Sequence, residues 1–263
     1  MTAISLATVR AARAAKGRNV VAIASGKGGV GKTWFAVTLA HALAKFGART
    51  LLFDGDLGLA NVDIQLGLMP EKDLGGVLAG QLTLRQAAMP VPEAGFDVIA
   101  GRSGSGTLAT LPAPVLTALH DNLMALSADY DRVVIDLGAG VDGAVRQLGN
   151  EARTILVVTT PEPTALTDAY AFIKLTHQDR PNADLRVVVN MVANSREGER
   201  TYQTLLKACE NFLKISPPLA GIIRRDSKVA DSIRHQTPIL SRHPNADAAG
   251  DVAAIARQLL AEP

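Results

Sequence analysis

The chain has 263 residues, 48% of them hydrophobic, and its 27 basic and 25 acidic residues leave a formal charge of +2. This length can bury a substantial core, as one large α/β domain or two small ones. The near-balanced charge gives no strong field that would draw the whole protein onto nucleic acid or membrane. A single cysteine, Cys209, excludes an internal disulfide and suits a reducing cytosol, and its helical spacing beside Leu205 and Phe212 favours core packing.

The first 18 residues form a basic segment without an acidic residue. They lack the apolar stretch of a secretory signal, and no apolar run in the chain approaches the ~18 residues of a membrane span. We expect either a fraying tail or a short basic amphipathic helix that touches a membrane or a partner. The predicted organisation is therefore a tail over 1–18 and one domain over 19–263.

Short apolar runs rich in Val and Ile recur along the chain and do not alternate with polar residues. This pattern is typical of strands that are buried on both faces, as in a parallel sheet. Longer amphipathic segments separate them, which predicts a three-layer, doubly wound α/β fold with a mostly parallel sheet. The predicted strands are 19–25, 50–54, 96–101, 132–136, 154–160, 185–191 and 219–223. The predicted helices are 32–46, 112–127, 163–177, 200–213, 226–235 and 246–260, with a loop at 101–107.

A phosphate-loop motif follows the first predicted strand and opens the first predicted helix. The segment GKGGVGKT matches G-x-x-x-x-G-K-[ST], whose glycines let backbone N–H groups face phosphate oxygens while the helix adds its positive end. We expect Lys32 to reach the β- and γ-phosphates and Thr33 to bind Mg²⁺, which predicts ATP and Mg²⁺ as cofactors. The predicted nucleotide-binding residues of this segment are Gly26, Lys27, Gly28, Gly29, Val30, Gly31, Lys32, Thr33 and Trp34.

The loop holds a second lysine, Lys27, which by itself would be expected to be solvated. The whole string KGGVGKT resembles the deviant Walker A motif of the MinD/ParA family of ATPases. The resemblance implies that Lys32 serves the chain's own ATP, whereas Lys27 crosses a two-fold interface to the partner's nucleotide in an ATP-dependent homodimer. Many family members carry threonine or asparagine in place of Trp34, which is expected to pack against helix or sheet or to edge toward the nucleotide.

Acidic residues end two of the predicted strands. Asp54 and Asp56 lie in LLFDGD, where a spacing of two puts both side chains on one face if the strand continues. Taken alone, DGD could be only a turn. The resemblance implies that Asp56 positions the hydrolytic water, that Asp54 supports the magnesium shell and that Asp136, in RVVIDLGAG, is the Walker B acid. The catalytic set is therefore Lys27, Lys32 and Asp56, and the metal set is Thr33, Asp54 and Asp136.

Two further segments are predicted to lie near the nucleotide base. Asn190 ends LRVVVN and matches the asparagine that reads adenine in the family, although a strand can simply end on asparagine. The segment 221–238 matches the family's base-side loop and helix. Within it, Asp226 either caps the helix or lines the base pocket.

Three stretches resemble one branch of the family, the flagellar-number regulators of the FlhG or FleN type. They are DLGLANVDIQLGL (56–68), TTPEPTALTDAYAFIKL (159–175) and VVNMV (188–192), and the spacing to DSKVADSIRHQTP (226–238) matches as well. This resemblance implies a slow regulatory ATPase of the cytoplasm, peripheral at the membrane, that limits flagellar number. It also implies as partners an FlhF-like GTPase, a flagellar switch-complex protein or a transcription activator. The N-terminus lacks the branch's activating element, and the C-terminus resembles a core helix rather than a membrane-targeting tail.

Two other classes of function stay open. A ParA-like partitioning ATPase would bind nonspecific DNA through a basic face. The residues for such a face are Arg224, Arg225, Lys228, Arg234 and Arg242. A metabolic P-loop enzyme, such as an amidoligase or a reductase-type iron protein, is less favoured because one cysteine cannot hold a cluster and no further substrate motif is present.

Overall fold

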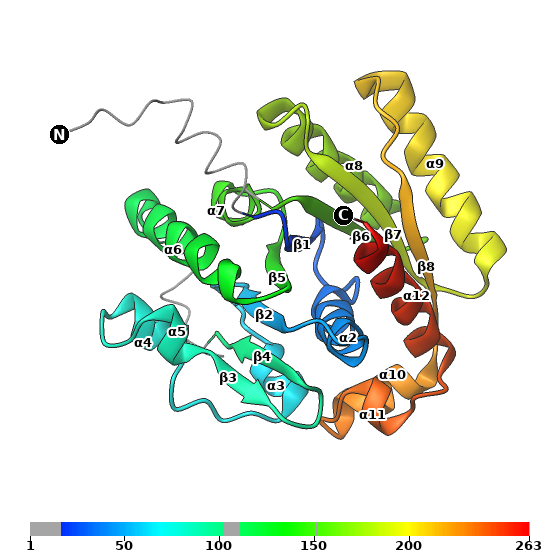
Figure 1. The fold of residues 1–263 in the computed structure, drawn as a ribbon. Coiled ribbons are helices and arrows are strands. Elements are labelled where there is room, and N and C mark those ends of the chain that lie inside the picture. Colours follow the sequence, from blue (N-terminus) through cyan, green and yellow to red (C-terminus); the bar gives the residue numbers. More distant parts are fainter. Residues whose placement is uncertain (1–16, 102–110, 151, 263) are drawn as a thin grey trace.

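The computed structural model describes residues 17–101, 111–150 and 152–262, and within them eight strands form one sheet (Figure 1). The strands are β1 (Val20–Ser25), β2 (Thr50–Gly55), β3 (Met89–Val91), β4 (Phe96–Ile99), β5 (Arg132–Ala139), β6 (Thr154–Thr159), β7 (Asp184–Val192) and β8 (Leu219–Arg224). Their order is β3-β4-β2-β5-β1-β6-β7-β8, and only β3 pairs antiparallel to its neighbour. The predicted doubly wound, mostly parallel α/β fold is confirmed.

Helices cover both faces of this sheet, with α2 and α12 on one face and α6, α8 and α9 on the other (Figure 1). The longer helices are α2 (Lys32–Lys45), α6 (Ala113–Leu126), α8 (Pro163–Asp179), α9 (Ser195–Leu213), α10 (Ser227–Arg234) and α12 (Asp247–Ala261). The shorter ones are α3 (Val62–Leu66), α4 (Leu74–Leu78), α5 (Leu84–Ala87), α7 (Gly143–Leu148) and α11 (Ile239–Arg242), besides a 3₁₀ turn at Ser127–Asp129.

The strands are apolar along their length because their side chains pack into hydrophobic layers on both faces of the sheet. In β1, Val21 and Ile23 pack into the layer of α2 and α12, whereas Val20 and Ala22 pack into the opposite layer. Successive side chains of a strand point to opposite faces, so a strand between two helical layers needs apolar residues at nearly every position. The absence of alternation in the sequence has this physical cause.

The structure differs from the sequence-based prediction at short elements. Strand β3 was not predicted, because three residues carry no periodicity and Pro90 is tolerated only at an edge such as this one. Helix α9 begins at Ser195 rather than at 200, since the Asn194 side chain accepts a hydrogen bond from the Glu197 N–H at 3.0 Å and caps it. The five short helices were also missed, as each is too brief to show a helical period.

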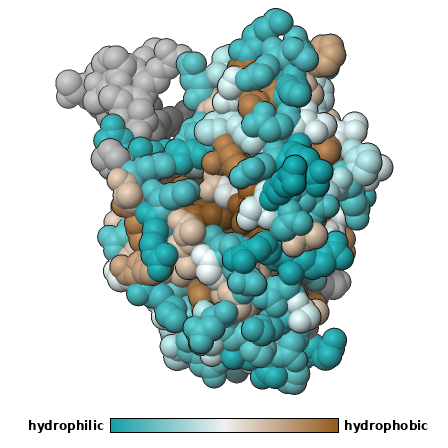
Figure 2. Space-filling view, turned by 90° about the vertical axis from the view of Figure 1, so that its right-hand side faces the viewer, coloured by the Kyte–Doolittle hydropathy of each residue, from teal (hydrophilic) through white to brown (hydrophobic). Residues whose placement is uncertain are grey.

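Several other predictions concern the N-terminal tail, an internal loop, the burial of Cys209 and α12, and membrane-spanning helices. Of the tail or basic helix expected over 1–18, residues 1–16 lie outside the described residues, and so do residues 102–107 of the loop expected at 101–107. Cys209 is fully buried, and α12 buries Val252, Ile255 and Leu259, so both core predictions are confirmed. Among the described residues, no helix combines the length and apolarity that crossing a membrane requires. The face shown in Figure 2 is predominantly hydrophilic, with hydrophobic residues gathered mainly toward its middle.

Candidate nucleotide-binding site

The predicted site residues meet at the carboxyl ends of the central parallel strands. Residues 26–31 join β1 to α2, Asp54 and Asp136 lie in β2 and β5, and Asn190 lies in β7. This is where open parallel sheets bind ligands, because loops leaving adjacent strands there diverge and leave a crevice.

The phosphate loop is fitted closely into the fold on one side and open on the other. A Cβ on Gly26 would lie 2.0 Å from the Asp168 carbonyl oxygen of α8, so only glycine fits there. Gly31 has φ 85°, and a Cβ on it would lie 2.5 Å from Asn190 Nδ2. At Gly28 and Gly29 a Cβ would have no heavy atom within 4 Å. The exposed backbone of these two glycines therefore forms an open cradle, as phosphate oxygens require.

The start of α2 supplies the positive end of the site. The helix begins directly after Gly31, without a side-chain cap and without an acidic residue in its first turn. The first N–H groups of a helix have no partner within it, so this end attracts an anion. Lys32 is buried beside it, and its Nζ lies 3.6 Å from Asp136 Oδ1. A phosphate group would meet both the N–H groups and this ammonium.

Asp54 and Asp136 are paired carboxylates in the centre of the sheet. They are register partners on β2 and β5, and they are 0% and 1% exposed. Burial, and then the charge of Asp136, raises the pKa of Asp54 to about 7. Burial also raises the pKa of Asp136, against the opposing charge of Lys32. Two buried carboxylates with one ammonium leave excess negative charge that a cation would stabilise.

This arrangement fits the predicted Mg²⁺. Both carboxylate oxygens of Asp136 are buried without a close hydrogen-bond donor among the described residues, although the side chains of Lys32 and Thr33 lie near enough to oppose the rise of its pKa. Magnesium prefers oxygen ligands and usually keeps few protein ligands beside waters and phosphates. Thr33 stands half-buried at the start of α2, next to Lys32. Thr33, Asp54 and Asp136 thus offer oxygen atoms of the kind that Mg²⁺ prefers. Their role as its ligands stays a prediction.

Asp56 follows the end of the strand but stays beside Asp54, whose Oδ1 accepts a hydrogen bond from the Asp56 N–H at 3.2 Å. The condition for both side chains to share a face is not met, because β2 ends at Gly55. The half-buried Asp56 turns back locally, and its Oδ1 accepts a hydrogen bond from the Leu59 N–H at 3.0 Å. It lines a cavity of about 430 Å³ together with Gly138 of β5. Asp56 thus lies at the edge of the site, where a water molecule has access.

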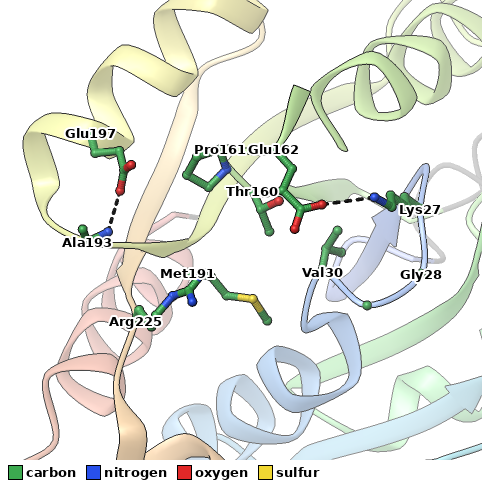
Figure 3. A pocket seen from close by; sticks show the side chains of 11 residues that line it. Lys27, Gly28, Val30, Thr160, Pro161, Glu162, Met191, Ala193, Glu197 and Arg225 are labelled. Carbon is green, nitrogen blue, oxygen red and sulfur yellow. Dashed lines mark hydrogen bonds and ion pairs between the residues drawn. The ribbon is translucent and has the colours of Figure 1, made fainter. Parts of the chain in front are cut away.

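The two lysines of the loop have different surroundings. Lys32 has a side chain that is 8% exposed, whereas that of Lys27 is 37% exposed. Figure 3 shows Lys27 directed at Glu162, which follows β6. Its Nζ lies 3.1 Å from Glu162 Oε2 and donates a hydrogen bond to Thr164 Oγ1 at 2.8 Å. Lys27 is therefore held by its own chain on the outer side of the loop.

Glu162 and Thr164 were not identified from the sequence as site residues. A signal was present, because Glu162 lies in the connection between β6 and α8, at the edge where ligands bind, and Thr164 lies in the first turn of α8. Glu162 lines an outer cavity of about 410 Å³ together with Lys27, Gly28, Met191 and Arg225 (Figure 3), and Thr164 contacts this lining only by its hydrogen bond with Lys27.

A second cavity of about 320 Å³ lies on the other side of Met191. Asn190 lines it, but its side chain already binds the protein: Nδ2 donates to the Val30 carbonyl and Oδ1 accepts from the Met191 N–H, both at 2.8 Å. These two bonds use one N–H of Nδ2 and one lone pair of Oδ1, so each atom keeps one further hydrogen-bonding position that base recognition could use. Asp226 caps α10 by accepting from the Lys228 N–H, which confirms the predicted cap; it also lines the cavity, and its place in a base pocket stays a prediction.

Trp34 packs in the core, as one of the two arrangements expected of it requires. It is 5% exposed and packs in the hydrophobic core with Val30 and Phe35. It also lines the 320 Å³ cavity, opposite the residues of α10. The indole is thus both a core residue and part of a cavity wall.

The basic residues considered for DNA binding are partly neutralised. Arg224 pairs with Asp251 at 2.8 Å and with Asp247 at 3.1 Å, and Arg242 pairs with Asp231 at 2.6 Å. These cations already have carboxylate partners, so phosphate contacts would have to compete with them.

Comparison with known proteins relates this chain to one family of nucleotide-binding domains. The family model described as CobQ/CobB/MinD/ParA nucleotide binding domain matches residues 21–239. Antiactivator FleN of Pseudomonas aeruginosa is 35% identical over 240 residues, covering 91% of this chain and 85% of that protein. Flagellum site-determining protein YlxH of Helicobacter pylori is 34% identical over 227 residues, covering 86% and 76%. The solved structure of the cell division ATPase MinD of Pyrococcus furiosus has a TM-score of 0.78 at 25% identity, covering 93% of this chain and 98% of that one.

Proposed function

Because this chain belongs to the CobQ/CobB/MinD/ParA family of nucleotide-binding domains, we propose that it is an ATP-driven switch that sets the number or position of flagella. The chain is a P-loop ATPase of the MinD/ParA type, and ATP hydrolysis resets the switch. The flagellar part of the proposal is supported by the similarity to an antiactivator, FleN, and to a flagellum site-determining protein, YlxH.

The nucleotide would lie along the carboxyl edge of the sheet. The cradle at Gly28 and Gly29 and the start of α2 would bind the phosphates, with Lys32 neutralising their charge. Mg²⁺ held by Thr33, Asp54 and Asp136 would stabilise negative charge on the β- and γ-phosphates. Asp56, at the edge of the site, would orient the attacking water.

The contrast between the two loop lysines carries the proposal of a homodimer. Lys32 lies inside, next to its own phosphate cradle, while Lys27 lies outside in a partly exposed ion pair. An exposed ion pair contributes about 0.2–1 kcal/mol, so Lys27 can leave Glu162 and Thr164 at little cost. The charges of a partner's ATP would be a stronger attraction for it, and dimerisation would then depend on ATP.

Light scattering after size exclusion tests the switch. Wild type and Asp56→Ala are run with Mg·ATP and with Mg·ADP; we expect a dimer with ATP, most persistent in Asp56→Ala because hydrolysis is blocked, and a monomer with ADP. Lys27→Ala should stay monomeric in ATP, whereas Lys207→Ala, which removes an exposed lysine from α9, should behave as wild type. A monomer in every state, or an unchanged dimer in Lys27→Ala, would contradict the proposal.

The biological role has a separate test in a flagellated host. Deletion of the gene should change the number or position of flagella, and Lys27→Ala should not restore them. We propose action in the cytoplasm, with peripheral contact at the membrane. The partners would be an FlhF-like GTPase, a flagellar switch-complex protein or a transcription activator. Normal flagellation after deletion would contradict the flagellar part of the proposed function, while the proposal of an ATP-driven switch would stand.

A further inference from the structure

The loop that joins β2 to α3 is attached at both of its ends to one carboxylate. Oδ1 of Asp54 accepts a hydrogen bond from the Asp56 N–H, and Oδ2 of the same side chain accepts one from the Val62 N–H, both at 3.2 Å. Asp56 is the first residue after the strand, and Val62 is the first residue of the helix. The path of residues 56–61 therefore depends on a single side chain.

Asp54 is itself held firmly in the sheet. It is 0% exposed, and β2 lies between β4 and β5, with Asp54 in register with Asp136. A strand with a neighbour on each side cannot move without breaking backbone hydrogen bonds. The loop, in contrast, lies at the surface, where Leu59 is 72% exposed. The Asp54 carboxylate is thus the fixed point from which this loop is positioned.

The side chain of Asp56 depends on that loop for its position. Because β2 ends at Gly55, Asp56 is held by the bond of its own N–H to Asp54 and by the bond that its Oδ1 accepts from the Leu59 N–H at 3.0 Å. On the other side a Cβ on Gly138 would lie 3.5 Å from Asp56 Oδ1, so β5 leaves room for this carboxylate. A displaced loop would carry the carboxylate with it.

Asp136 differs from Asp54 in the use of its oxygen atoms. Both oxygens of Asp136 are buried without a close hydrogen-bond donor among the described residues, and Lys32 Nζ lies 3.6 Å from Oδ1. Their lone pairs are available to a cation, whereas each oxygen of Asp54 already uses one lone pair for the loop. Two neighbouring carboxylates of the sheet thus have different bonding.

We infer that Asp54 is a positioning residue, which serves hydrolysis by holding Asp56 and the start of α3 in place. The inference rests on the proposed function, in which Asp56 orients the attacking water. Mg²⁺ would then depend mainly on Thr33 and Asp136. Since a misplacement of about 1 Å can lower a rate about a hundredfold, loss of the hold on Asp56 should reduce kcat.

Asp54→Asn is the first test. The amide keeps one acceptor oxygen, but its Nδ2 would meet a backbone N–H as a second donor, so at least one bond to the loop is lost. We expect kcat for ATP hydrolysis to fall about ten- to hundredfold. The KM for Mg·ATP and the Mg²⁺ concentration that gives half the maximal rate should stay within about threefold of wild type. Asp136→Asn is the comparison, and it should raise the Mg²⁺ requirement about tenfold or more.

Gly101→Ala is a second variant that leaves both carboxylates chemically unchanged. Gly101 follows β4, and a Cβ on it would lie 2.4 Å from Ala60 Cβ and 3.4 Å from Asp54 Oδ2. The added methyl group must therefore displace the loop at Ala60. We expect a lower kcat with an unchanged Mg²⁺ requirement. Gly250→Ala of α12, where a Cβ would have no heavy atom within 4 Å, is the matched control and should behave as wild type.

Hydrogen exchange of the nucleotide-free proteins reports on the loop without hydrolysis. Residues 56–66 should exchange faster in Asp54→Asn and in Gly101→Ala than in wild type, while β1 and β6 keep their protection. Faster exchange throughout the chain with a lowered Tm would mean that Asp54 only stabilises the fold, which would overturn the inference. Recovery of the wild-type kcat in Asp54→Asn at high Mg²⁺ would also overturn it, because Asp54 would then act as a metal ligand. If Asp54→Asn does not fold, Gly101→Ala decides, and a faster-exchanging loop with the wild-type kcat would contradict the inference.

Asp56→Ala separates the inference from the proposed function. Loss of hydrolysis in Asp56→Ala, with the wild-type kcat in Asp54→Asn, would overturn the inference and leave the proposed switch standing. Hydrolysis by Asp56→Ala at the wild-type rate would contradict the role proposed for Asp56, and the inference with it.

Discussion

The proposed phosphate side and the proposed base side of the nucleotide site are built in different ways. The phosphate side consists mostly of one continuous segment, residues 26–33, whose backbone N–H groups would bind the phosphate oxygens. The base side is assembled from Trp34 of α2, Asn190 of β7 and the segment around Asp226, which are far apart in the chain. Recognition by backbone therefore needs only a local motif, whereas recognition by side chains needs the complete sheet.

The two sides are joined at one point. Asn190 Nδ2 donates to the Val30 carbonyl of the loop, and the space that a Cβ on Gly31 would occupy is taken by the same amide. A change in Asn190 on the base side would therefore be felt by the phosphate loop. Substitutions that act on one side, on both or on neither can measure how far the two sides are coupled.

Lys32→Ala should have the largest effect and should act on the phosphate side. It removes a buried ammonium whose hydrogen bonds to charged phosphate oxygens are worth about 1.5–3 kcal/mol, so Mg·ATP affinity should fall roughly ten- to hundredfold. Calorimetry measures this fall. The substitution also leaves Asp136 without its cationic neighbour, and an unchanged affinity would mean that phosphates do not bind at this loop.

Gly31→Ala should damage both sides together. At φ 85° an alanine is strained by about 1–2 kcal/mol, and its Cβ must displace Asn190 Nδ2. We expect a lower Tm in thermal unfolding and weaker binding of both Mg·ADP and tripolyphosphate. Gly143→Ala, at a position with open space and no positive φ, is the matched control. Weakening of Mg·ADP alone would show that the loop is insensitive to Asn190.

His41→Leu should change stability without acting on either side of the site. His41 is buried in α2, and burial, with a smaller effect from Lys45, lowers its pKa from 6.5 to about 4. Between pH 6.5 and pH 4 the imidazole of His41 is therefore protonated in the unfolded chain but stays neutral in the folded chain. The free energy of unfolding consequently decreases as pH falls through this interval. Relative to wild type, His41→Leu should gain on the order of 2 kcal/mol over that interval.

Thermal unfolding between pH 7 and pH 4 checks this expectation. The half-buried His177 of α8 provides the control variant His177→Leu, and nucleotide affinity at pH 7 should equal that of wild type in both. A difference in Tm between His41→Leu and wild type that does not change with pH would contradict the assignment of acid sensitivity to His41.

Glu162→Gln should have the smallest effect and should favour the dimer. Loss of the ion pair frees Lys27, and an exposed pair of this kind is worth about 0.2–1 kcal/mol, so dimerisation in ATP should strengthen by up to about fivefold for each of the two pairs that a two-fold dimer releases. Sedimentation at several protein concentrations measures the constant, with the exposed Glu199→Gln of α9 as control. A weaker dimer in Glu162→Gln would instead assign Glu162 to the interface itself.

The sequence by itself determined the features that depend on neighbouring residues. Uninterrupted apolar runs predicted seven of the strands, because a strand covered on both faces needs apolar residues throughout. The phosphate loop was also predictable, since its function lies in a short backbone motif between a strand and a helix. Asp54 and Asp136 were found because they end such strands.

Only the tertiary structure decided how distant residues meet. Asn190 and Val30 are 160 positions apart and Lys27 and Glu162 are 135 apart, and no local pattern specifies such pairs. Nor did the spacing of Asp54 and Asp56 reveal that the strand stops at Gly55 and sends the second carboxylate to the edge of the site. Side-chain contacts of this kind depend on strand order and on the packing of α2, α8 and α10 against the sheet. They arise only when the whole sheet has formed, because each helix is positioned by the strands beneath it.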